Sequence, residues 1–226
     1  MEYREIISEL KKHSNPENVA GMARFGINPE NTLGVSVPVL RGLAKKIGKD
    51  HRLALKLWKS NIHEARILAS MVDDVGKVDA KQVDRWISDF DSWDVCDQVM
   101  MNLFWMLPDA PELAVKYART DGEFTKRAGF ALMAVFAWKN KGADDKLFDP
   151  FLAEIISASS DVRNYVKKSV NWALRQIGKR NARLNRKAVA ASEKILAKGD
   201  KSSMWIANDA LRELKGEAVV KKLGIK

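Results

Sequence analysis

Apolar residues recur every three to four positions along almost the whole chain, which is the pattern of amphipathic helices. Only residues 33–37 alternate between apolar and small or polar positions, and Pro38 ends that stretch. Strand signals are otherwise nearly absent. We therefore predict helices at residues 2–13, 16–24, 38–47, 51–59, 62–74, 79–90, 92–106, 110–119, 123–140, 145–158, 161–179, 182–198 and 202–215.

The predicted helices are joined by short loops and pair about every 35–45 residues, which is typical of HEAT-type α-solenoids. Such a pair cannot bury its apolar faces alone, so neighbouring pairs must stack. We predict an all-α fold, an α–α superhelix of about five to six HEAT-like pairs, forming a single domain over residues 1–226. An irregular helical bundle is the alternative. A curved stack would offer a long concave surface that suits a rod-shaped ligand such as a duplex.

The composition favours a polyanionic partner. Lys and Arg number 39 against 29 Asp and Glu, which gives a net charge of +10 and a pI near 9.6. DNA, RNA and anionic lipid are the candidate partners. No apolar run reaches about 18 residues, so we expect no membrane span.

The residues that bear on compartment and cofactors are few. The lone cysteine, Cys96, cannot form an internal disulfide and favours a reducing compartment, so we expect a cytoplasmic protein. The three histidines do not pair at metal-ligand spacing, and we expect neither a metal nor a cofactor. A monomer is expected, because a concave groove needs no symmetry mate.

An aromatic ring and a carboxylate share one face of the helix predicted at 92–106. Trp93 and Asp97 are four residues apart, so they lie on the same side, at the edge of the apolar stripe. That stripe consists of Val95, Cys96, Val99, Leu103 and Leu107. The alternative is a core tryptophan beside a solvated acid that the helix dipole favours.

Two later helices carry further candidates. The helix at 123–140 is apolar all round and therefore largely buried, and Arg127 near its start needs a carboxylate or a phosphate as partner. In the helix at 161–179, Trp172 lies outside the apolar stripe among cations. An ordinary salt bridge and a solvated charged surface are the respective alternatives. The proposed phosphate-binding residues in this helix and in the basic stretch that follows it are Lys168, Arg175, Lys179, Arg180 and Arg183.

The remaining tryptophans have a structural interpretation. We predict that five of them pack in the core or between repeats: Trp58, Trp86, Trp105, Trp138 and Trp205.

Several of these stretches resemble the AlkD-type DNA alkylation-repair glycosylases, whose fold is a horseshoe of HEAT-like repeats. The similarity runs from about Met22 to Leu214. It rests on LGVSVPVLR at 33–41, EAR at 64–66, SWDVCDQ at 92–98, KRAG at 126–129 and SVNWALR at 169–175. The chain departs from many relatives at Gly21, where they carry a tyrosine.

The resemblance implies an active site and a reaction. A Trp with an Asp four residues later, an Arg two helices on and a further Trp correspond to Trp93, Asp97, Arg127 and Trp172. It implies excision of cationic alkylated bases, such as 3-methyladenine and 7-methylguanine, from duplex DNA without base flipping. Asp97 would stabilise an oxocarbenium-like sugar, the tryptophans would cradle the deoxyribose, and Arg127 would hold a phosphate.

Two other classes of function fit the same sequence. One is a non-catalytic HEAT-repeat module that binds distorted DNA through the same basic groove. The other is a protein scaffold whose concave face binds an acidic partner. Asp97 argues against a pure DNA binder, since a carboxylate facing phosphates is repelled by them.

Overall fold

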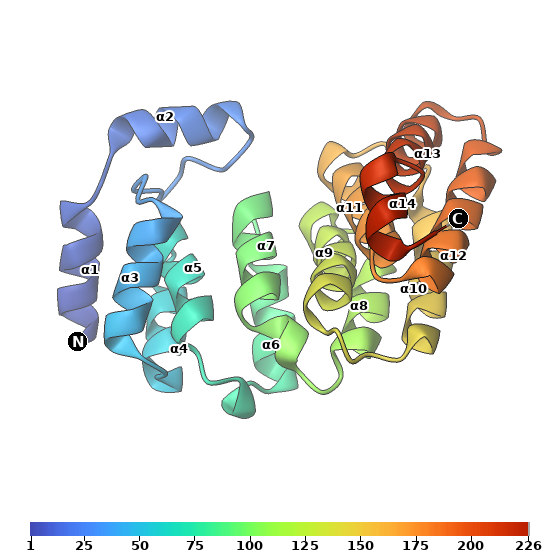
Figure 1. The fold of residues 1–226 in the computed structure, drawn as a ribbon. Coiled ribbons are helices and arrows are strands. Elements are labelled where there is room, and N and C mark those ends of the chain that lie inside the picture. The colour runs from blue at the N-terminus through green and yellow to red at the C-terminus, as the bar shows by residue number, and fades with distance from the viewer. Residues whose placement is uncertain (226) are drawn as a thin grey trace. The chain divides into compact units, whose positions relative to one another are not determined.

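The computed structural model describes residues 1–225, and every regular element within them is a helix (Figure 1). In the first half these are α1 (Tyr3–Lys12), α2 (Pro16–Arg24), α3 (Val37–Ile47), α4 (His51–Lys59), α5 (His63–Val72), η1 (Val75–Lys77), α6 (Ala80–Ser88), α7 (Trp93–Asn102) and η2 (Phe104–Met106). In the second half they are α8 (Ala110–Ala118), α9 (Glu123–Lys139), η3 (Asp145–Leu147), α10 (Phe148–Ala158), α11 (Asn164–Gly178), α12 (Ala182–Leu196), α13 (Lys201–Leu214) and α14 (Glu217–Leu223). The predicted all-α fold is confirmed.

The helix boundaries follow the predicted ones except at three places. The helix predicted at 92–106 ends at Asn102, because the backbone of Leu103 leaves the helical region at φ −137° and ψ −63°. The helix predicted from 161 begins at Asn164, and Val162, expected in its apolar stripe, is 82% exposed. The short helix α14 was not predicted.

The chain divides into two compact units, Met1–Leu107 and Pro108–Lys226. The single-domain organisation stays a prediction. In the N-terminal unit, α5 is the central helix, and it packs against α1, α3, α4 and α7. Nearly every residue of α5 is buried. Helix α2 runs across the ends of its neighbours instead of lying alongside them (Figure 1).

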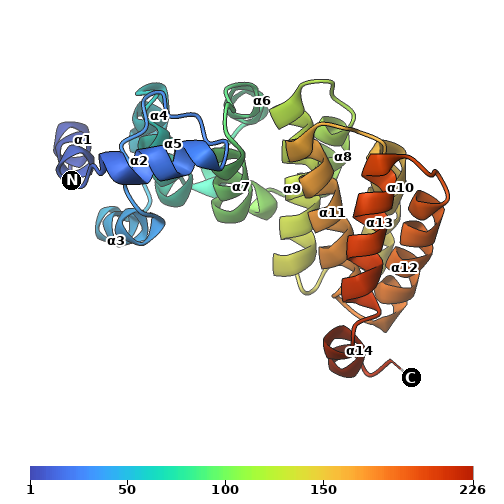
Figure 2. The ribbon, with the colours of Figure 1, turned by 90° about the horizontal axis from the view of Figure 1, so that it is seen from above.

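The C-terminal unit consists of two layers of helices (Figure 2). Successive helices pair as α8 with α9, α10 with α11, and α12 with α13. Helix α11 also packs against α9 and α13, and α10 packs against α8 and α12. This is the packing expected when amphipathic helix pairs stack to bury faces that one pair cannot cover.

The most buried helix is α9, which is apolar on all sides as the sequence predicted. Its residues from Arg127 to Ala137 are all buried. Gly129 brings it against α8 so closely that a Cβ at this position would overlap the backbone nitrogen of Ala118 and lie 2.7 Å from the carbonyl oxygen of Ala114. The glycine in the KRAG stretch is therefore needed for helix packing.

No helix among residues 1–225 combines the length and the apolar character required to cross a membrane.

Candidate functional site

The N-terminus of α7, which carries Trp93 and Asp97, is held in place by the loop that follows α2. The Asn28 backbone N–H donates to Ser92 Oγ at 2.8 Å, and its side-chain amide donates to Asp91 Oδ2 at 3.1 Å. The Trp93 indole N–H donates to the carbonyl oxygen of Phe25 at 3.1 Å. Ser92 is the N-cap by position, but its hydroxyl oxygen accepts from this loop instead of from the helix.

A buried carboxylate holds the next segment, between α2 and α3. Glu64 is 1% exposed, and it accepts hydrogen bonds from the backbone N–H groups of Leu33, Gly34 and Val35 at 2.6–3.2 Å. Gly34 has a φ of +78°, where a side chain would be strained. The stretches at 33–41 and 64–66 that carry the family resemblance thus form one interaction.

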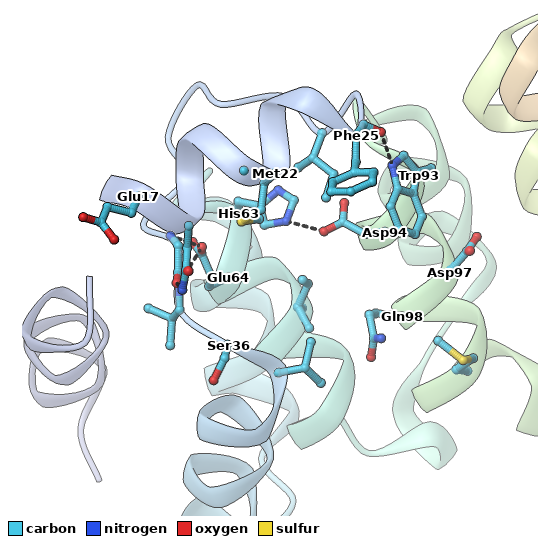
Figure 3. A pocket seen from close by; sticks show the side chains of 18 residues that line it. Glu17, Met22, Phe25, Ser36, His63, Glu64, Trp93, Asp94, Asp97 and Gln98 are labelled. Atoms are coloured by element: carbon cyan, nitrogen blue, oxygen red, sulfur yellow. Dashed lines mark hydrogen bonds and ion pairs between the residues drawn. The ribbon is translucent and has the colours of Figure 1, made fainter. Parts of the chain in front are cut away.

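These two anchored segments border a pocket of about 620 Å³, which lies within the N-terminal unit (Figure 3). Apolar side chains make up much of its wall. The residues that line it are Glu17, Asn18, Gly21, Met22, Phe25, Ile27, Gly34, Val35, Ser36, Val37, His63, Glu64, Ile67, Trp93, Asp94, Asp97, Gln98 and Met101.

The structure places Trp93 and Asp97 together on the wall of this pocket, as the spacing predicts. Asp97 is 9% exposed, and Trp93 is half-buried. The predicted apolar stripe is buried, with Val95, Cys96 and Val99 on α7 and Leu103 and Leu107 after its end. A carboxylate with so little exposure to solvent interacts with a nearby positive charge more strongly than a fully solvated one.

A second acid of α7 lines the pocket and pairs with a histidine. His63 Nε2 lies 2.8 Å from Asp94 Oδ2, and the side chain of His63 is 3% exposed. Burial alone would lower the pKa of His63, but its hydrogen bond to Asp94 and the nearby carboxylates outweigh it and raise the pKa above 6.5. The other oxygen of Asp94, Oδ1, is buried and has no hydrogen-bond partner.

The other two residues of the predicted quartet belong to the C-terminal unit. Arg127 on α9 is 6% exposed, and its Nη1 donates to the carbonyl oxygen of Tyr165 on α11 at 2.8 Å. Trp172 lies two turns further along α11 and is half-buried. The quartet thus consists of one pair in each unit, and its assembly into one active site stays a prediction.

The predicted phosphate-binding residues differ in how much of their charge is available. Lys168 and Arg183 are exposed and have no ion pair among the described residues. Arg175 and Lys179 both bind Glu213, each at 2.6 Å. Residues 168, 172, 175 and 179 share one face of α11. The ring of Trp172 therefore lies near the unpaired Lys168 and near the two cations that Glu213 binds.

Arg180 has a structural role that the sequence did not reveal. Its Nη1 donates to the carbonyl oxygens of Ala137 at 2.5 Å and of Asn140 at 2.9 Å. Its guanidinium lies 4.4 Å from the ring centroid of Phe148. It thus fixes the loop after α9. Its carbonyl partners, 43 and 40 residues earlier in the chain, distinguish Arg180 from its basic neighbours.

Of the five tryptophans predicted to pack in the core or between repeats, two are buried as predicted and two are exposed. Trp58 and Trp86 are buried and stack on each other, with ring centroids 4.0 Å apart. Trp138 and Trp205, expected in packing, are 47% and 41% exposed. The exposure of Trp138 and Trp205 was not predicted because it depends on which helices pack against them, and the sequence pattern of one helix does not show this.

The net positive charge lies in the C-terminal unit. Met1–Leu107 holds 15 basic and 15 acidic residues, whereas Pro108–Lys226 holds 24 basic and 14 acidic, which accounts for the whole excess of +10. Between residues 163 and 187 there are nine basic side chains and no acidic one. A polyanion is therefore attracted mainly to the second unit.

Three polar residues of the pocket, His63, Asp94 and Gln98, were not among the candidates predicted from the sequence. His63 precedes Glu64 in the EAR stretch, and the other two lie within SWDVCDQ. The motifs indicated the segments that line the pocket. The contacts that bring these segments together join residues far apart in the chain, so the sequence pattern does not reveal them. Among the described residues, no group of three or more His, Cys, Asp and Glu side chains is arranged to hold a metal ion.

Comparisons with known proteins agree with this picture. One solved structure matches with a TM-score of 0.74 and 20% identity, covering 86% of this chain and 83% of its own. It represents a family described as related to the HEAT-like repeat DNA glycosylases, with affinity for branched DNA structures. This likeness shows that the fold is of the HEAT-like repeat type.

A designed armadillo repeat protein in complex with the peptide (KR)4 also matches, with a TM-score of 0.41 and 14% identity over 82% of this chain and 78% of its own. No curated protein matches. The model of a family described as DNA alkylation repair enzyme matches residues 6–214. With nearly the whole length matched, this chain belongs to the DNA alkylation repair enzyme family.

Proposed function

We propose that this protein is a DNA glycosylase that excises cationic alkylated bases, such as 3-methyladenine and 7-methylguanine, from duplex DNA. The observation that carries the proposal is Asp97, a carboxylate 9% exposed beside Trp93 on the wall of the pocket. Membership of the DNA alkylation repair enzyme family supports it.

The reaction needs little from the protein apart from charge stabilisation. Alkylation at adenine N3 or guanine N7 makes the base cationic. When the C1′–N bond breaks, its electron pair goes to the base, which leaves neutral without a general acid. Positive charge then develops on the sugar, as in other glycosyl transfers. Water adds to C1′ and loses a proton, which leaves an abasic sugar.

Each residue of the quartet has a role in this chemistry. Asp97 stabilises the positive charge on the sugar and orients the attacking water. Trp93 and Trp172 pack against the deoxyribose, and their π faces favour a nearby cation. Arg127 binds a backbone phosphate. We further propose that the lesion stays in the base stack until its bond breaks.

The direct test is to incubate the protein with methylated duplex DNA and to identify the bases released. Wild-type protein should release 3-methyladenine or 7-methylguanine. Asp97→Asn should bind the duplex as well as wild type or slightly better, and its single-turnover rate should drop about 100- to 1,000-fold, the usual effect of losing one preorganised electrostatic group. The exposed carboxylate Asp121 provides the control, Asp121→Asn, which should keep the wild-type rate.

A wild-type rate in a stably folded Asp97→Asn protein would remove the role given to this carboxylate. If wild-type protein binds DNA and releases no base, the second candidate function holds, a non-catalytic module for distorted or branched DNA. The affinity for branched DNA described for the structural neighbour favours this alternative.

A further inference from the structure

Helices α11 and α13 lie side by side in the C-terminal unit and meet in a regular register (Figure 2). The Asn171 side-chain amide donates to Asp209 Oδ2 at 2.7 Å, and one turn later Arg175 Nη1 lies 2.6 Å from Glu213 Oε2. The residues of each pair are 38 positions apart in the chain. At both turns, a carboxylate on α13 binds the polar or cationic side chain that faces it on α11.

At the preceding turn, the same spacing of 38 positions joins Lys167 to Trp205, and the ammonium of Lys167 lies 5.1 Å from the ring centroid of Trp205. The place that an acid takes at the other two turns is taken here by an indole, so Lys167 has no carboxylate opposite it. Trp205 is 41% exposed, although tryptophan side chains are highly buried on average. This turn of the contact between the helices therefore presents a free cation and an accessible ring.

Two further lysines extend this surface. Lys201 lies one turn before Trp205 on the same side of α13, and Lys168 follows Lys167 on α11, turned toward the face that carries Trp172. Like Lys167, both lack an ion pair within residues 1–225. Three unpaired cations thus lie around one exposed indole, which is the combination that binds nucleic acid strands.

The carboxylates close to this surface already have partners. Asp200 accepts from the backbone N–H of Ser203 at 2.9 Å and from the hydroxyl of Ser160 at 2.7 Å, and Asp209 pairs with Arg212 as well as with Asn171. By contrast, the pocket of the N-terminal unit is acidic, because four carboxylates and no Lys or Arg line it. A polyanion is favoured at the lysines and disfavoured in the acidic pocket.

We propose that Trp205 and these lysines bind an unpaired nucleotide of single-stranded DNA, with the indole stacked on the base. In an intact duplex the bases cover each other's faces, so an indole can stack only on a base that is unpaired. An exposed cation–π contact is weaker than the stack of a base on an indole, so the base displaces the ammonium of Lys167. The flexible lysine then reaches the adjoining phosphate. This site requires DNA binding but no glycosylase activity, and it goes beyond the proposed function.

The first experiment measures the affinity for labelled oligothymidine of about 12 nucleotides and for a duplex of the same length by fluorescence anisotropy. Trp205→Ala should bind oligothymidine about 5- to 150-fold more weakly than wild type, the effect of losing one stack between a base and an aromatic ring. It should lose much less affinity for the duplex. Trp205→Phe, which keeps an aromatic face, should retain most of the affinity for oligothymidine.

Trp205→Glu is a sharper variant, because it places a carboxylate opposite Lys167 as at the other two turns. It should therefore melt at the wild-type temperature and bind oligothymidine more weakly than Trp205→Ala. The matched control is Trp138→Ala, since Trp138 is 47% exposed and has the ammonium of Lys139 5.5 Å from its ring centroid. This control should bind oligothymidine like wild type.

The lysine is tested by the salt dependence of the same binding. Lys167→Gln should lower the slope of log affinity against log salt by about 0.7, the value for one phosphate contact on a single strand. Lys194→Gln makes the same charge change at an exposed, unpaired lysine of α12 and should leave the slope unchanged.

The inference is overturned if wild type does not bind oligothymidine, or if Trp205→Ala, correctly folded by circular dichroism, binds it as tightly as wild type. Equal losses for oligothymidine and duplex also overturn it, because the surface would then be a general DNA contact. Base release from methylated duplex by wild type judges the proposed function separately. Either result can fail while the other holds, so the two failures are distinguishable.

Discussion

Three buried ionisable side chains in the N-terminal unit show how this fold accommodates charge. Glu64 is surrounded by backbone N–H groups, and His63 is paired with Asp94. Arg66 lies 5.3 Å from the ring centroid of Trp58 and donates to the carbonyl oxygen of Asp89 at 3.3 Å. Each charge has a partner, as buried charges require. Each partner lies on another element, so these residues also fix how the helices meet.

The pairing of His63 with Asp94 predicts that stability depends on pH. Because the folded state raises the pKa of His63 above 6.5, the folded protein holds this proton more tightly than the unfolded chain. The contribution is complete below the unfolded pKa and is lost as the pH rises through the folded pKa. We expect the difference in unfolding free energy between wild type and His63→Gln to be larger at about pH 6 than at about pH 9 in urea titrations. If this difference in unfolding free energy does not change with pH, the pairing with Asp94 does not raise the pKa of His63.

Glu213 predicts a gain in DNA binding when it is removed. Its carboxylate binds both Arg175 and Lys179, at 2.6 Å each, and therefore competes with phosphate for them. Glu213→Gln should raise affinity for duplex DNA at low salt on the order of tenfold, because two cations become available for phosphates. Glu193→Gln is the control, since Glu193 pairs at 2.9 Å with Lys215. Unchanged or weaker binding in Glu213→Gln would mean that α11 does not face the DNA.

At the scale of elements, the sequence predicted thirteen helices well because most have a clear apolar stripe, whereas α9 is apolar on all sides. The misses have local causes. The carboxylate of Asp161 binds the backbone and guanidinium of Arg163, so the helix predicted from residue 161 starts later. Helix α14 spans seven residues, too few for periodicity to stand out.

The contact between α8 and α9 predicts a large effect from one methyl group. In Gly129→Ala the new Cβ would overlap the backbone of Ala118, and backbone cannot move aside as a flexible side chain can. We expect a loss of about 1–3 kcal/mol or more in unfolding free energy. Gly178→Ala should cost less, because its new Cβ meets chiefly the side-chain end of Leu214.

Gly42→Ala is the reference in the same thermal and urea titrations. Nothing lies within 4 Å of its added Cβ, so it should stabilise the protein by about 0.5–1 kcal/mol. If Gly129→Ala behaves like Gly42→Ala, the close approach of α8 and α9 is not as described.

On the scale of the whole molecule, the two units differ in charge. The first has no net charge and contains the acidic pocket, and the second has the entire excess of +10. The sequence revealed Trp93 and Asp97 as neighbours because their relation is local to one helix. It did not reveal the pocket, because the pocket depends on Phe25, Gly34 and His63 reaching α7 from distant positions.

This charge distribution predicts which cations determine the salt dependence of DNA binding. Lys168 and Arg183 are exposed and available, so replacing both by Ala should lower the slope of log affinity against log salt by about 1.8, or about 0.9 for each phosphate contact. Arg180→Ala should leave the slope unchanged and lower the melting temperature, because Arg180 binds backbone carbonyls. An unchanged slope in the double variant would place the phosphate contacts on other residues.

The stack of Trp58 on Trp86 has an optical consequence. The two indoles lie 4.0 Å apart with planes only 4° from parallel, and both are buried in the N-terminal unit. Two indole rings held so close couple their excited states. This coupling produces a circular dichroism signal that disappears when the rings separate. The unit that contains the acidic pocket therefore carries its own spectroscopic reporter, whereas the exposed Trp138 and Trp205 belong to the other unit and report on solvent and ligands. Loss of this signal therefore follows the unfolding of the N-terminal unit in an unlabelled sample.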